Sequence, residues 1–382
     1  MRQSRRTLLQ LTAAAMAWRS APAWARKQPP NRPRALAEIA ASAVTDGHSA
    51  GIGLGYCLPI KSPVATGYGK ANLETGAPAN GDTVFRNASC TKQFTAAAIL
   101  LLAERGKLRV EDRLAIFFPD FPRGDEVTLH QLLTHTSGVH DYVFGGLPDD
   151  SWPDWQKHAD RHRYLARMKT VFDFEPGTYW AYSNSGYALL GEIVERASGK
   201  SYIDFVTDNL LVPAGMSATM LEDPARIVRN RASGYSLQDG KAGAFRNAAF
   251  GGVPIAEGGL CSTAGDLLRW NRALYSGRLL SPDNVRRMTT AATVRDGRPV
   301  GQAHFGKEGE RPPFMTQADY GYGLEISRMF GRRVFWHSGG IQGFNAILLH
   351  FPDDRADLVL LSNTDNGAVP IFEPALRAIL LA

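Results

Sequence analysis

Strand-like segments at both ends of this 382-residue chain constrain its fold more than any other feature. Residues 51–70 are Gly-rich and alternate, with Ile52 and Leu54 on one face, a pattern that predicts strands and turns. From residue 320 onward, four strand-like stretches are separated by Gly or Pro-Asp-Asp turns, which predicts an antiparallel meander. The middle of the chain, residues 107–289, is richer in helical patterns. Strands from both ends can share one sheet if this helical part is inserted between them.

We therefore expect a mixed α/β fold of the α+β type. An antiparallel sheet is built from the N- and C-terminal segments and flanked by helices, and a mostly helical subdomain is inserted into it. The predicted organisation, in chain order, is an export signal at 1–25, a linker at 26–34 and one domain at 35–382. Within this domain, the α/β part comprises 35–106 and 290–382, and the mostly helical part comprises 107–289. Helices are expected at 34–44, 185–196, 264–275 and 368–382.

The first 25 residues have the three parts of an export signal. Arg5 and Arg6 give a twin-arginine start, residues 8–18 are apolar, and Ala23-Trp24-Ala25 is a small-residue cleavage site. The apolar part is too short for a membrane-spanning helix. The sequence thus predicts a periplasmic or secreted bacterial protein without a stable membrane anchor. It leaves the choice between the twin-arginine and general export routes open, and the oligomeric state as well.

Charge and cysteine content argue against two classes of function. The 43 basic and 37 acidic residues give a net charge of +6, but four of the arginines and no acid lie in the signal, so the remainder carries 39 minus 37, or +2. With no clustered Lys/Arg run, we expect no nucleic-acid partner. Cys57, Cys90 and Cys261 form an odd, low count without Cys-x-x-Cys, which predicts neither a disulfide framework nor a structural zinc site.

The chemistry centres on the only Ser-x-x-Lys of the chain, Ser89 to Lys92, which opens an apolar run at 94–103. If a buried helix begins at the serine, residues i and i+3 share a face, so the lysine amine can activate the serine hydroxyl. The positive end of the helix also favours developing negative charge there. Lys92 acts as a base only if its pKa falls from about 10.4. By itself, however, the tetrapeptide fits a capped helix with a surface lysine at least as well.

Two further stretches favour an active site. Tyr182-Ser-Asn184 is the only Tyr-x-Asn and precedes a predicted helix. Its tyrosine can exchange protons with the serine and lysine, and its asparagine can bind a substrate amide or orient the lysine. His337-Ser-Gly-Gly340 ends a predicted Gly-rich edge strand, where a substrate backbone can approach and an N–H is available for an oxyanion hole.

Taken together, these motifs resemble the serine hydrolases of the class C β-lactamase and penicillin-binding-protein family. The family also includes esterases, D-amino-acid peptidases and proteins of unassigned substrate. The resemblance covers roughly residues 35–380. Further stretches that carry it are Phe85-Arg-Asn-Ala-Ser, Leu132-Leu-Thr-His-Thr-Ser-Gly, Phe174-Glu-Pro-Gly-Thr, Tyr182-Ser-Asn-Ser-Gly-Tyr and Gly258-Gly-Leu-Cys-Ser-Thr-Ala.

The resemblance implies a role for each matching residue. Ser89 forms an acyl-enzyme, while Lys92 and Tyr182 handle its proton and that of the leaving group, in a division that sequence leaves open. Asn184, His337 and Gly339 contact the substrate, and the backbone N–H groups of Ser89 and Gly340 form the oxyanion hole. No metal or organic cofactor is implied, and the partner is a small ester or peptide substrate.

One departure bears on the substrate. Class C β-lactamases have Lys-Thr-Gly where this chain has His337-Ser-Gly339, and histidine is only partly charged at pH 7 if its pKa stays near ~6.5. We therefore favour ester or small amide and D-peptide substrates over β-lactams. A D-alanyl-D-alanine carboxypeptidase, a D-aminopeptidase or a weak β-lactamase are alternatives, and a scaffold that binds peptidoglycan fragments is a non-enzyme alternative. The loops at 141–163 and 295–319 are expected to decide the substrate.

Other patterns in the chain are weaker candidates for function. The G-x-S-x-G match around Ser49 follows a helix and precedes a strand, the reverse of a nucleophile elbow. His158 and His162 have ligand spacing but lack the zincin base, so we interpret them as surface histidines. His135 is expected to be a structural hydrogen-bonding group. The aromatics Tyr142, Trp152 and Trp155 are interpreted either as lining of a cleft mouth or as hydrophobic cover.

Overall fold

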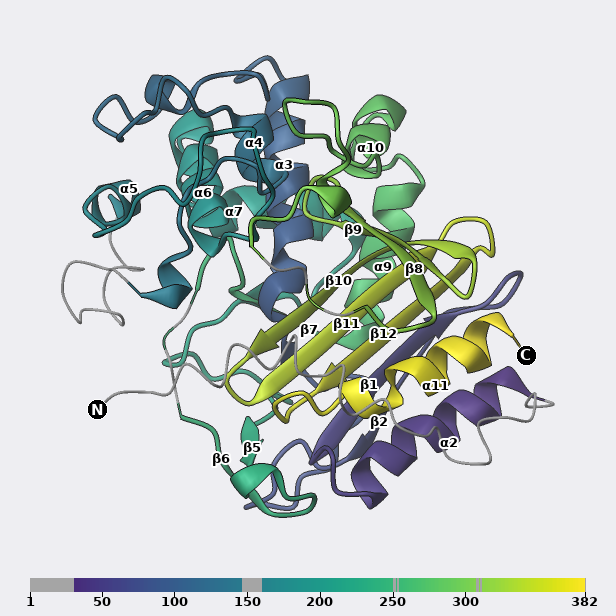
Figure 1. Cartoon of the computed structure of the whole chain (residues 1–382). Coiled ribbons are helices and arrows are strands. Elements are labelled where there is room, and N and C mark those ends of the chain that lie inside the picture. The colour runs from purple at the N-terminus through teal and green to yellow at the C-terminus, as the bar shows by residue number, and fades with distance from the viewer. Residues whose placement is uncertain are drawn as a thin grey trace.

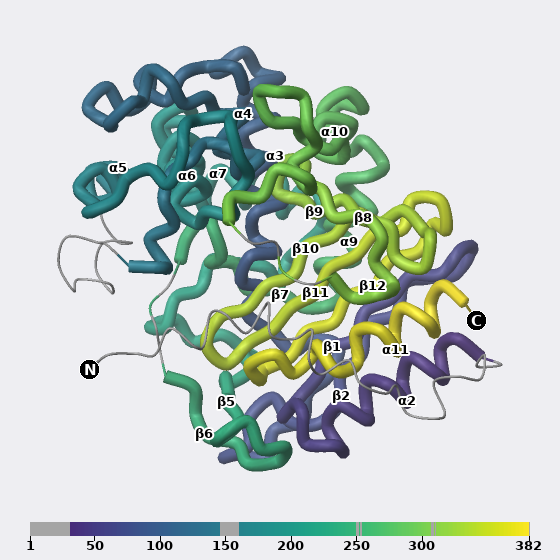
Figure 2. Tube along the Cα trace, in the orientation of Figure 1, coloured from purple at the N-terminus to yellow at the C-terminus, as the bar shows by residue number. Residues whose placement is uncertain are grey.

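A seven-stranded antiparallel sheet organises the molecule (Figures 1 and 2). The computed structural model describes residues 31–145, 160–249, 252, 254–306, 309 and 311–381. The strand order is β2-β1-β12-β11-β10-β9-β8, so the two N-terminal strands pair with the end of the C-terminal meander. The strands are β1 Gly51–Cys57, β2 Val64–Gly69, β8 Met315–Tyr320, β9 Glu325–Met329, β10 Arg332–Ile341, β11 Phe344–Phe351 and β12 Ala356–Ser362.

Each face of the sheet is covered by its own helices. On one face, α2 (Arg32–Thr45) and α11 (Val369–Leu380) lie together across the strands (Figure 1). Their apolar side chains form one core with inward residues of β1, β10, β11 and β12. On the other face lies α9 (Ala264–Tyr275), together with the helical part of the chain and a larger core. The sheet is thus a central layer, buried on both sides.

The helical part packs around α3 (Lys92–Glu104), whose residues from Lys92 to Leu102 are all buried. This stretch is buried on every side and mostly apolar because the helix lies at the centre of its own layer. The α-helices around it are α4 Leu129–Leu133, α5 Arg161–Leu165, α6 Asn184–Ser198, α7 Tyr202–Val206, α8 Val212–Ala214 and α10 Pro282–Met288. The shorter 3₁₀ and π segments are η3 Ala88–Thr91, η4 Leu114–Ile116, η5 Tyr142–Phe144, η7 Thr207–Leu211, η8 Gln238–Gly240 and η9 Val300–Gln302. The described chain also forms two small sheets. One has the strand order β3-β7-β4, with β3 Phe85–Arg86, β7 Leu260–Ser262 and β4 Met220–Leu221, and the other pairs β5 Tyr235–Leu237 with β6 Phe245–Asn247.

Glycines in β1 let the helical layer approach the sheet closely. A Cβ on Gly53 would lie 2.9 Å from the Phe85 ring, and a Cβ on Gly55 would lie 3.1 Å from the Ala264 carbonyl oxygen. The alternate residues Ile52 and Leu54 point into the α2–α11 core. The Gly-rich alternation therefore marks a strand with bulky residues on one face and close contact on the other.

The predicted architecture is confirmed in its main features. The N- and C-terminal strands share one antiparallel sheet, and the helices predicted at 185–196, 264–275 and 368–382 are present as α6, α9 and α11. Helix α2 begins at Arg32, two residues before its predicted start. No helix was expected at 282–288, and no strand at 315–320, where the sequence had indicated a loop.

The description of β10 as an edge strand needs correction. It lies between β11 and β9, but β9 pairs only with Arg332 to Trp336. On that side, residues 337–341 have no strand partner in the described chain. The Gly-rich end of β10 is therefore a local free edge within an otherwise paired strand, because β9 starts late.

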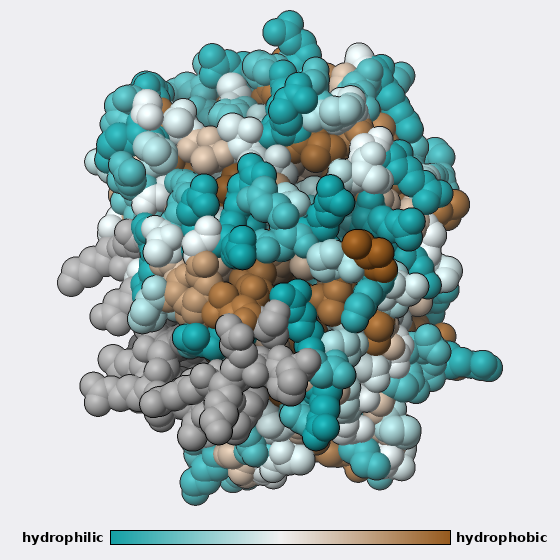
Figure 3. All heavy atoms as spheres, turned by 90° about the vertical axis from the view of Figure 1, so that its right-hand side faces the viewer, coloured by the Kyte–Doolittle hydropathy of each residue, from teal (hydrophilic) through white to brown (hydrophobic). Residues whose placement is uncertain are grey.

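On the face shown in Figure 3, polar side chains surround several brown, apolar groups of different size. Within the described residues, no helix combines the length and apolar character needed to cross a bilayer.

Candidate active site

Ser89 lies where a short strand turns abruptly into a helix. Strand β3 ends at Arg86, Ala88 adopts a left-handed φ of 46°, and the 3₁₀ segment η3 then leads directly into α3. A positive φ is unfavourable for a residue with a Cβ, so the surrounding structure must hold this turn in place. Within residues 83–102, Ser89 is the one residue that keeps partial exposure. The turn thus presents a single hydroxyl at the start of a buried helix.

Lys92 is fully buried one turn after Ser89. Its Nζ donates to the Ser89 hydroxyl at 3.3 Å, to Asn184 Oδ1 at 2.7 Å and to the backbone carbonyl of Glu257 at 2.6 Å. Burial lowers the pKa of Lys92 to about 7, although the nearby carboxylates of Glu257 and Asp141 act in the opposite direction. Near neutral pH both protonation states of the amine are therefore populated, and the neutral form can act as a general base.

Tyr182 and Asn184 come from the beginning of α6. Ser183 caps this helix through its side chain, and its backbone N–H donates to His135 Nδ1 at 3.0 Å. The cap places the Tyr182 ring 4.8 Å from Lys92 Nζ, and the hydroxyl oxygen of Tyr182 is buried. Burial raises the pKa of Tyr182 well above its usual value, and the Ser89 hydroxyl only partly offsets this. Tyr182 therefore keeps its proton over the ordinary pH range.

His135 is a structural hydrogen-bonding group, as the sequence predicted. It is buried among the rings of Tyr182, Tyr187 and Tyr320, and burial lowers its pKa well below the usual value. Its Nδ1 accepts from a backbone N–H, which leaves the proton on Nε2. A neutral histidine with this contact holds the start of α6 in place.

Strand β10 passes against the turn that presents Ser89. A Cβ on Gly339 would lie 2.3 Å from the Asn87 carbonyl oxygen and 2.9 Å from the Ser89 amide nitrogen. A Cβ on Gly340 would meet nothing within 4 Å. Gly339 is thus needed for the close approach of the two backbones, while Gly340 lies at the open side. The oxyanion hole predicted from Ser89 and Gly340 remains a prediction.

His337 is buried and neutral. Burial and the charge of Lys92 lower its pKa to about 3. Its Nδ1 lies 2.5 Å from the Ser338 carbonyl oxygen, so this nitrogen carries the proton, and Nε2 accepts from the Tyr320 hydroxyl at 3.0 Å. The ring therefore supplies no positive charge, and both nitrogens already have partners. Its predicted contact with substrate remains a prediction.

Two acidic residues near Lys92 were missed from the sequence. Asp141 is 4% exposed and Glu257 is 3% exposed. Asp141 Oδ2 accepts from Asn184 Nδ2 at 2.9 Å, and Glu257 Oε1 accepts from the Tyr142 hydroxyl at 2.8 Å. Both residues lie beside stretches that carried the family resemblance, but nothing in a linear pattern indicates that an acid is buried. Tyr142 is thus part of the interior, whereas Trp152 and Trp155 lie outside the described residues.

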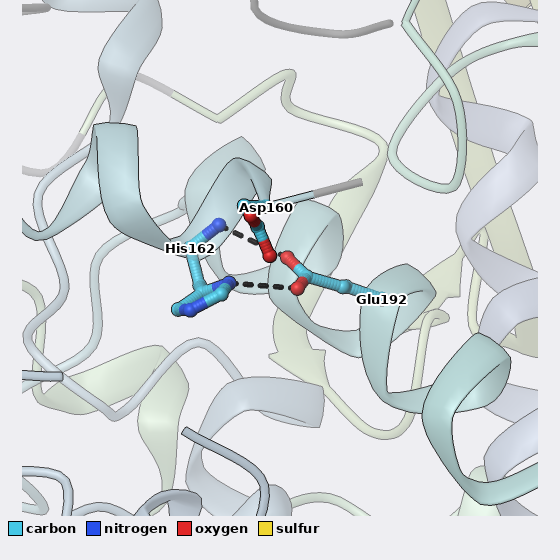
Figure 4. Close-up of side chains that lie close together, drawn as sticks. All are labelled: Asp160, His162 and Glu192. Atoms are coloured by element: carbon cyan, nitrogen blue, oxygen red, sulfur yellow. Dashed lines mark hydrogen bonds and ion pairs between the residues drawn. The ribbon is translucent and has the colours of Figure 1, made fainter. Parts of the chain in front are cut away.

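A second group of ionisable residues lies on α5 and α6, away from Ser89. His162 faces the Glu192 carboxylate through its ring at 2.7 Å and its backbone N–H at 3.0 Å, with Asp160 alongside (Figure 4). Arg196 also contacts Glu192 at 3.1 Å and lies 3.8 Å from Asp160. These guanidinium contacts identify an ion-pair network.

His162 is 6% exposed, so its interpretation as a surface histidine was wrong, because its ring stacks on Phe118 and pairs with Glu192. His158 lies outside the described residues. Ser49 is also buried, and its hydroxyl contacts Gly51 and Ser362, which agrees with a structural serine. Cys90 is buried with its thiol against the His337 carbonyl, and burial raises its pKa to about 12.

Comparison with known proteins decides the family. The family model described as Beta-lactamase matches residues 36–382. The chain belongs to the beta-lactamase family. Penicillin-binding protein 4* of Bacillus subtilis is 30% identical over 324 residues, which cover 78% of this chain and 64% of that protein. D-aminopeptidase of Gluconobacter oxydans is 28% identical over 325 residues, which cover 83% of this chain and 56% of that protein.

A solved structure supports the same assignment. The D-amino acid amidase from Ochrobactrum anthropi SV3, complexed with L-phenylalanine amide, matches with a TM-score of 0.75 at 25% identity, covering 91% of this chain and 98% of that one. This chain matches only part of its curated relatives: 64% of the length of penicillin-binding protein 4* and 56% of the length of the D-aminopeptidase.

The two adjacent glycines of β10 provide a matched test of this geometry. We expect Gly339→Ala to lower the free energy of unfolding by about 2 kcal/mol, because its Cβ overlaps the Asn87 carbonyl. Gly340→Ala should match the wild type in urea unfolding, because its Cβ enters open space. Equal stability of the two variants would contradict the close packing of β10 on the Ser89 turn.

Proposed function

We propose that this chain is a serine hydrolase that forms an acyl-enzyme at Ser89. The observation that carries the proposal is the buried amine of Lys92, 3.3 Å from the Ser89 hydroxyl. A serine hydroxyl needs such a base to become nucleophilic, and a lysine needs burial to act as one. Few structural roles would place a lysine at 0% exposure beside the single accessible serine of the segment.

The first step follows from the protonation states. Neutral Lys92 keeps two N–H bonds, which suffice for Asn184 Oδ1 and the Glu257 carbonyl. Its lone pair accepts the proton of Ser89 while Oγ forms a bond to the substrate carbonyl carbon. The carbonyl oxygen becomes an oxyanion, which the N–H groups of Ser89 and Gly340 are proposed to bind. We assign the base role to Lys92 because burial lowers its pKa to about 7, whereas burial keeps Tyr182 protonated.

The second step releases the leaving group. Tyr182 donates its proton to the leaving nitrogen or oxygen as the bond to the carbonyl carbon breaks, and the proton held by Lys92 restores Tyr182. The leaving group thus departs with the proton of Tyr182, and the proton lost by Ser89 replaces it on Tyr182. Water then attacks the acyl-enzyme by the same path in reverse.

The proposed substrates are esters and small amides or D-peptides. Relatives named as D-aminopeptidase and D-amino acid amidase support this class. The ionisable groups beside the Gly-rich end of β10 also support this substrate class. His337 is neutral there, and Glu325, whose register partners are Trp336 and Tyr320, adds a carboxyl with a pKa raised by burial to about 8. A substrate carboxylate finds no cation in this pair of groups, which disfavours carboxypeptidase and β-lactam substrates. Export to the periplasm or beyond remains part of the proposal, on the N-terminal pattern alone.

Labelling tests the nucleophile directly. A fluorophosphonate probe should label the wild type once per chain, and Ser89→Ala should abolish labelling because no other hydroxyl contacts Lys92 in the described chain. Ser62→Ala, at an exposed serine, should label as the wild type does. Undiminished labelling of the Ser89 variant would refute the assignment.

The pH dependence tests the base. We expect kcat/KM for p-nitrophenyl acetate to rise with pH and to reach half its maximum near pH 7, because the neutral fraction of Lys92 grows through its pKa of about 7. Lys92→Arg keeps the charge but cannot deprotonate, so it should lose about 10³-fold or more in kcat/KM. An arginine variant within tenfold of the wild type would exclude Lys92 as the base.

A further inference from the structure

The Asn184 amide lies between two charged groups of opposite sign. Its Oδ1 accepts from Lys92 Nζ at 2.7 Å, and its Nδ2 donates to Asp141 Oδ2 at 2.9 Å. This orientation follows from chemistry, because a lysine amine next to an acceptor donates and a carboxylate can only accept. A flipped amide would oppose N–H to N–H at Lys92 and oxygen to oxygen at Asp141.

We propose that Asp141 is a positioning residue of the hydrolase, which acts through the Asn184 amide to hold the Lys92 amine against Ser89. The inference rests on the proposed function and extends it to a residue that contacts neither the serine nor the lysine amine by a hydrogen bond. The chain of contacts is carboxylate, amide, amine and hydroxyl, with each donor facing one acceptor. Asp141 thus fixes the amide, and the amide fixes the amine.

Asp141 is itself held firmly. It precedes η5, and its Oδ1 accepts from the Val143 backbone N–H at 3.1 Å. The backbone N–H of the next residue, Tyr142, donates to the Ser185 hydroxyl oxygen, and the Tyr142 hydroxyl donates to Glu257 Oε1. These contacts tie η5 to the first turn of α6 and to the segment before β7. The carboxylate therefore cannot follow a displaced Asn184 without breaking a cap.

Asp141 also sets the charge around Lys92. Burial raises the pKa of Asp141, and the positive charge of Lys92 counteracts this; in return, the Asp141 carboxylate opposes the lowering of the Lys92 pKa. Groups that face Lys92 come from several elements. They are Ser89 and Cys90 on η3, Asp141 before η5, Tyr182, Asn184 and Tyr187 at the start of α6, Glu257 before β7, His135 after α4 and His337 on β10.

The two roles predict separable effects. Removing the carboxylate charge with Asp141→Asn should lower the pKa of Lys92 further and move the acid limb of the rate profile to lower pH by about one unit. The variant should also lose about 10- to 100-fold in the high-pH plateau, since the amide loses an anchor and the amine is misplaced. Asn184→Ala keeps the charge, so it should lose plateau rate while its acid limb stays near that of the wild type.

The test measures the second-order rate of fluorophosphonate labelling from pH 5 to 9. It compares the wild type, Asp141→Asn, Asn184→Ala and the double variant, with Asp208→Asn as a control at an exposed carboxylate paired with Lys200. If Asp141 acts through Asn184, the double variant should be little slower than the slower single variant. Circular dichroism melts establish which variants fold, and Asn184→Ala keeps the loss of plateau rate testable should Asp141→Asn fail to fold.

Three outcomes would overturn the inference. One is an Asp141→Asn profile whose acid limb coincides with that of the wild type, which would be the result of a merely structural aspartate. The second is full additivity of the two substitutions, and the third is a wild-type plateau in Asn184→Ala. Labelling that persists in Ser89→Ala would instead overturn the proposed function, so the two failures are distinguishable.

Discussion

The site depends on the burial of one amine, that of Lys92. An isolated ammonium in a protein interior is costly, so either the group deprotonates or the structure supplies acceptors. Here it has both: three oxygen acceptors within 3.3 Å and a pKa lowered toward neutrality. Much of the surrounding structure supplies what this amine requires. Helix α3 buries it, α6 brings the amide, and the segment before β7 brings a backbone carbonyl.

The sheet and the helical layer meet next to this amine, at the turn that presents Ser89. Strand β10 passes the Ser89 turn at a distance that Gly339 alone permits, and β9 starts late, which leaves the end of β10 without a partner. A substrate therefore has a free strand edge next to the accessible serine. Neutral His337 and the carboxyl of Glu325 give that edge no positive charge, which is the physical basis for proposing esters and amides.

Sequence patterns predicted the helices and strands that have a regular spacing of apolar residues, and the turns marked by Gly or Pro. Ser89 and Lys92 share a helix turn, so their proximity followed from spacing alone, and the Gly-rich alternation of β1 indicated its strand. The burial of polar side chains whose partners lie far away in the sequence was not predictable. Asp141 reaches Asn184 over 43 positions, and nothing in either local pattern distinguishes it from a surface acid. His162 was misinterpreted for the same reason, and β8 was missed because its strand character depends on pairing with β9.

Burial should bring the pKa of Lys92 close to neutral pH, and a direct titration of its amine tests this most sharply. Nuclear magnetic resonance of protein labelled with ¹³C at the lysine Cε would follow each amine, with Lys92 assigned by its loss in Lys92→Arg. One lysine should titrate near pH 7, well below the ~10.4 of an unperturbed lysine side chain. A Lys92 amine that is still charged above pH 9 would contradict a lowered pKa and the role of Lys92 as the base.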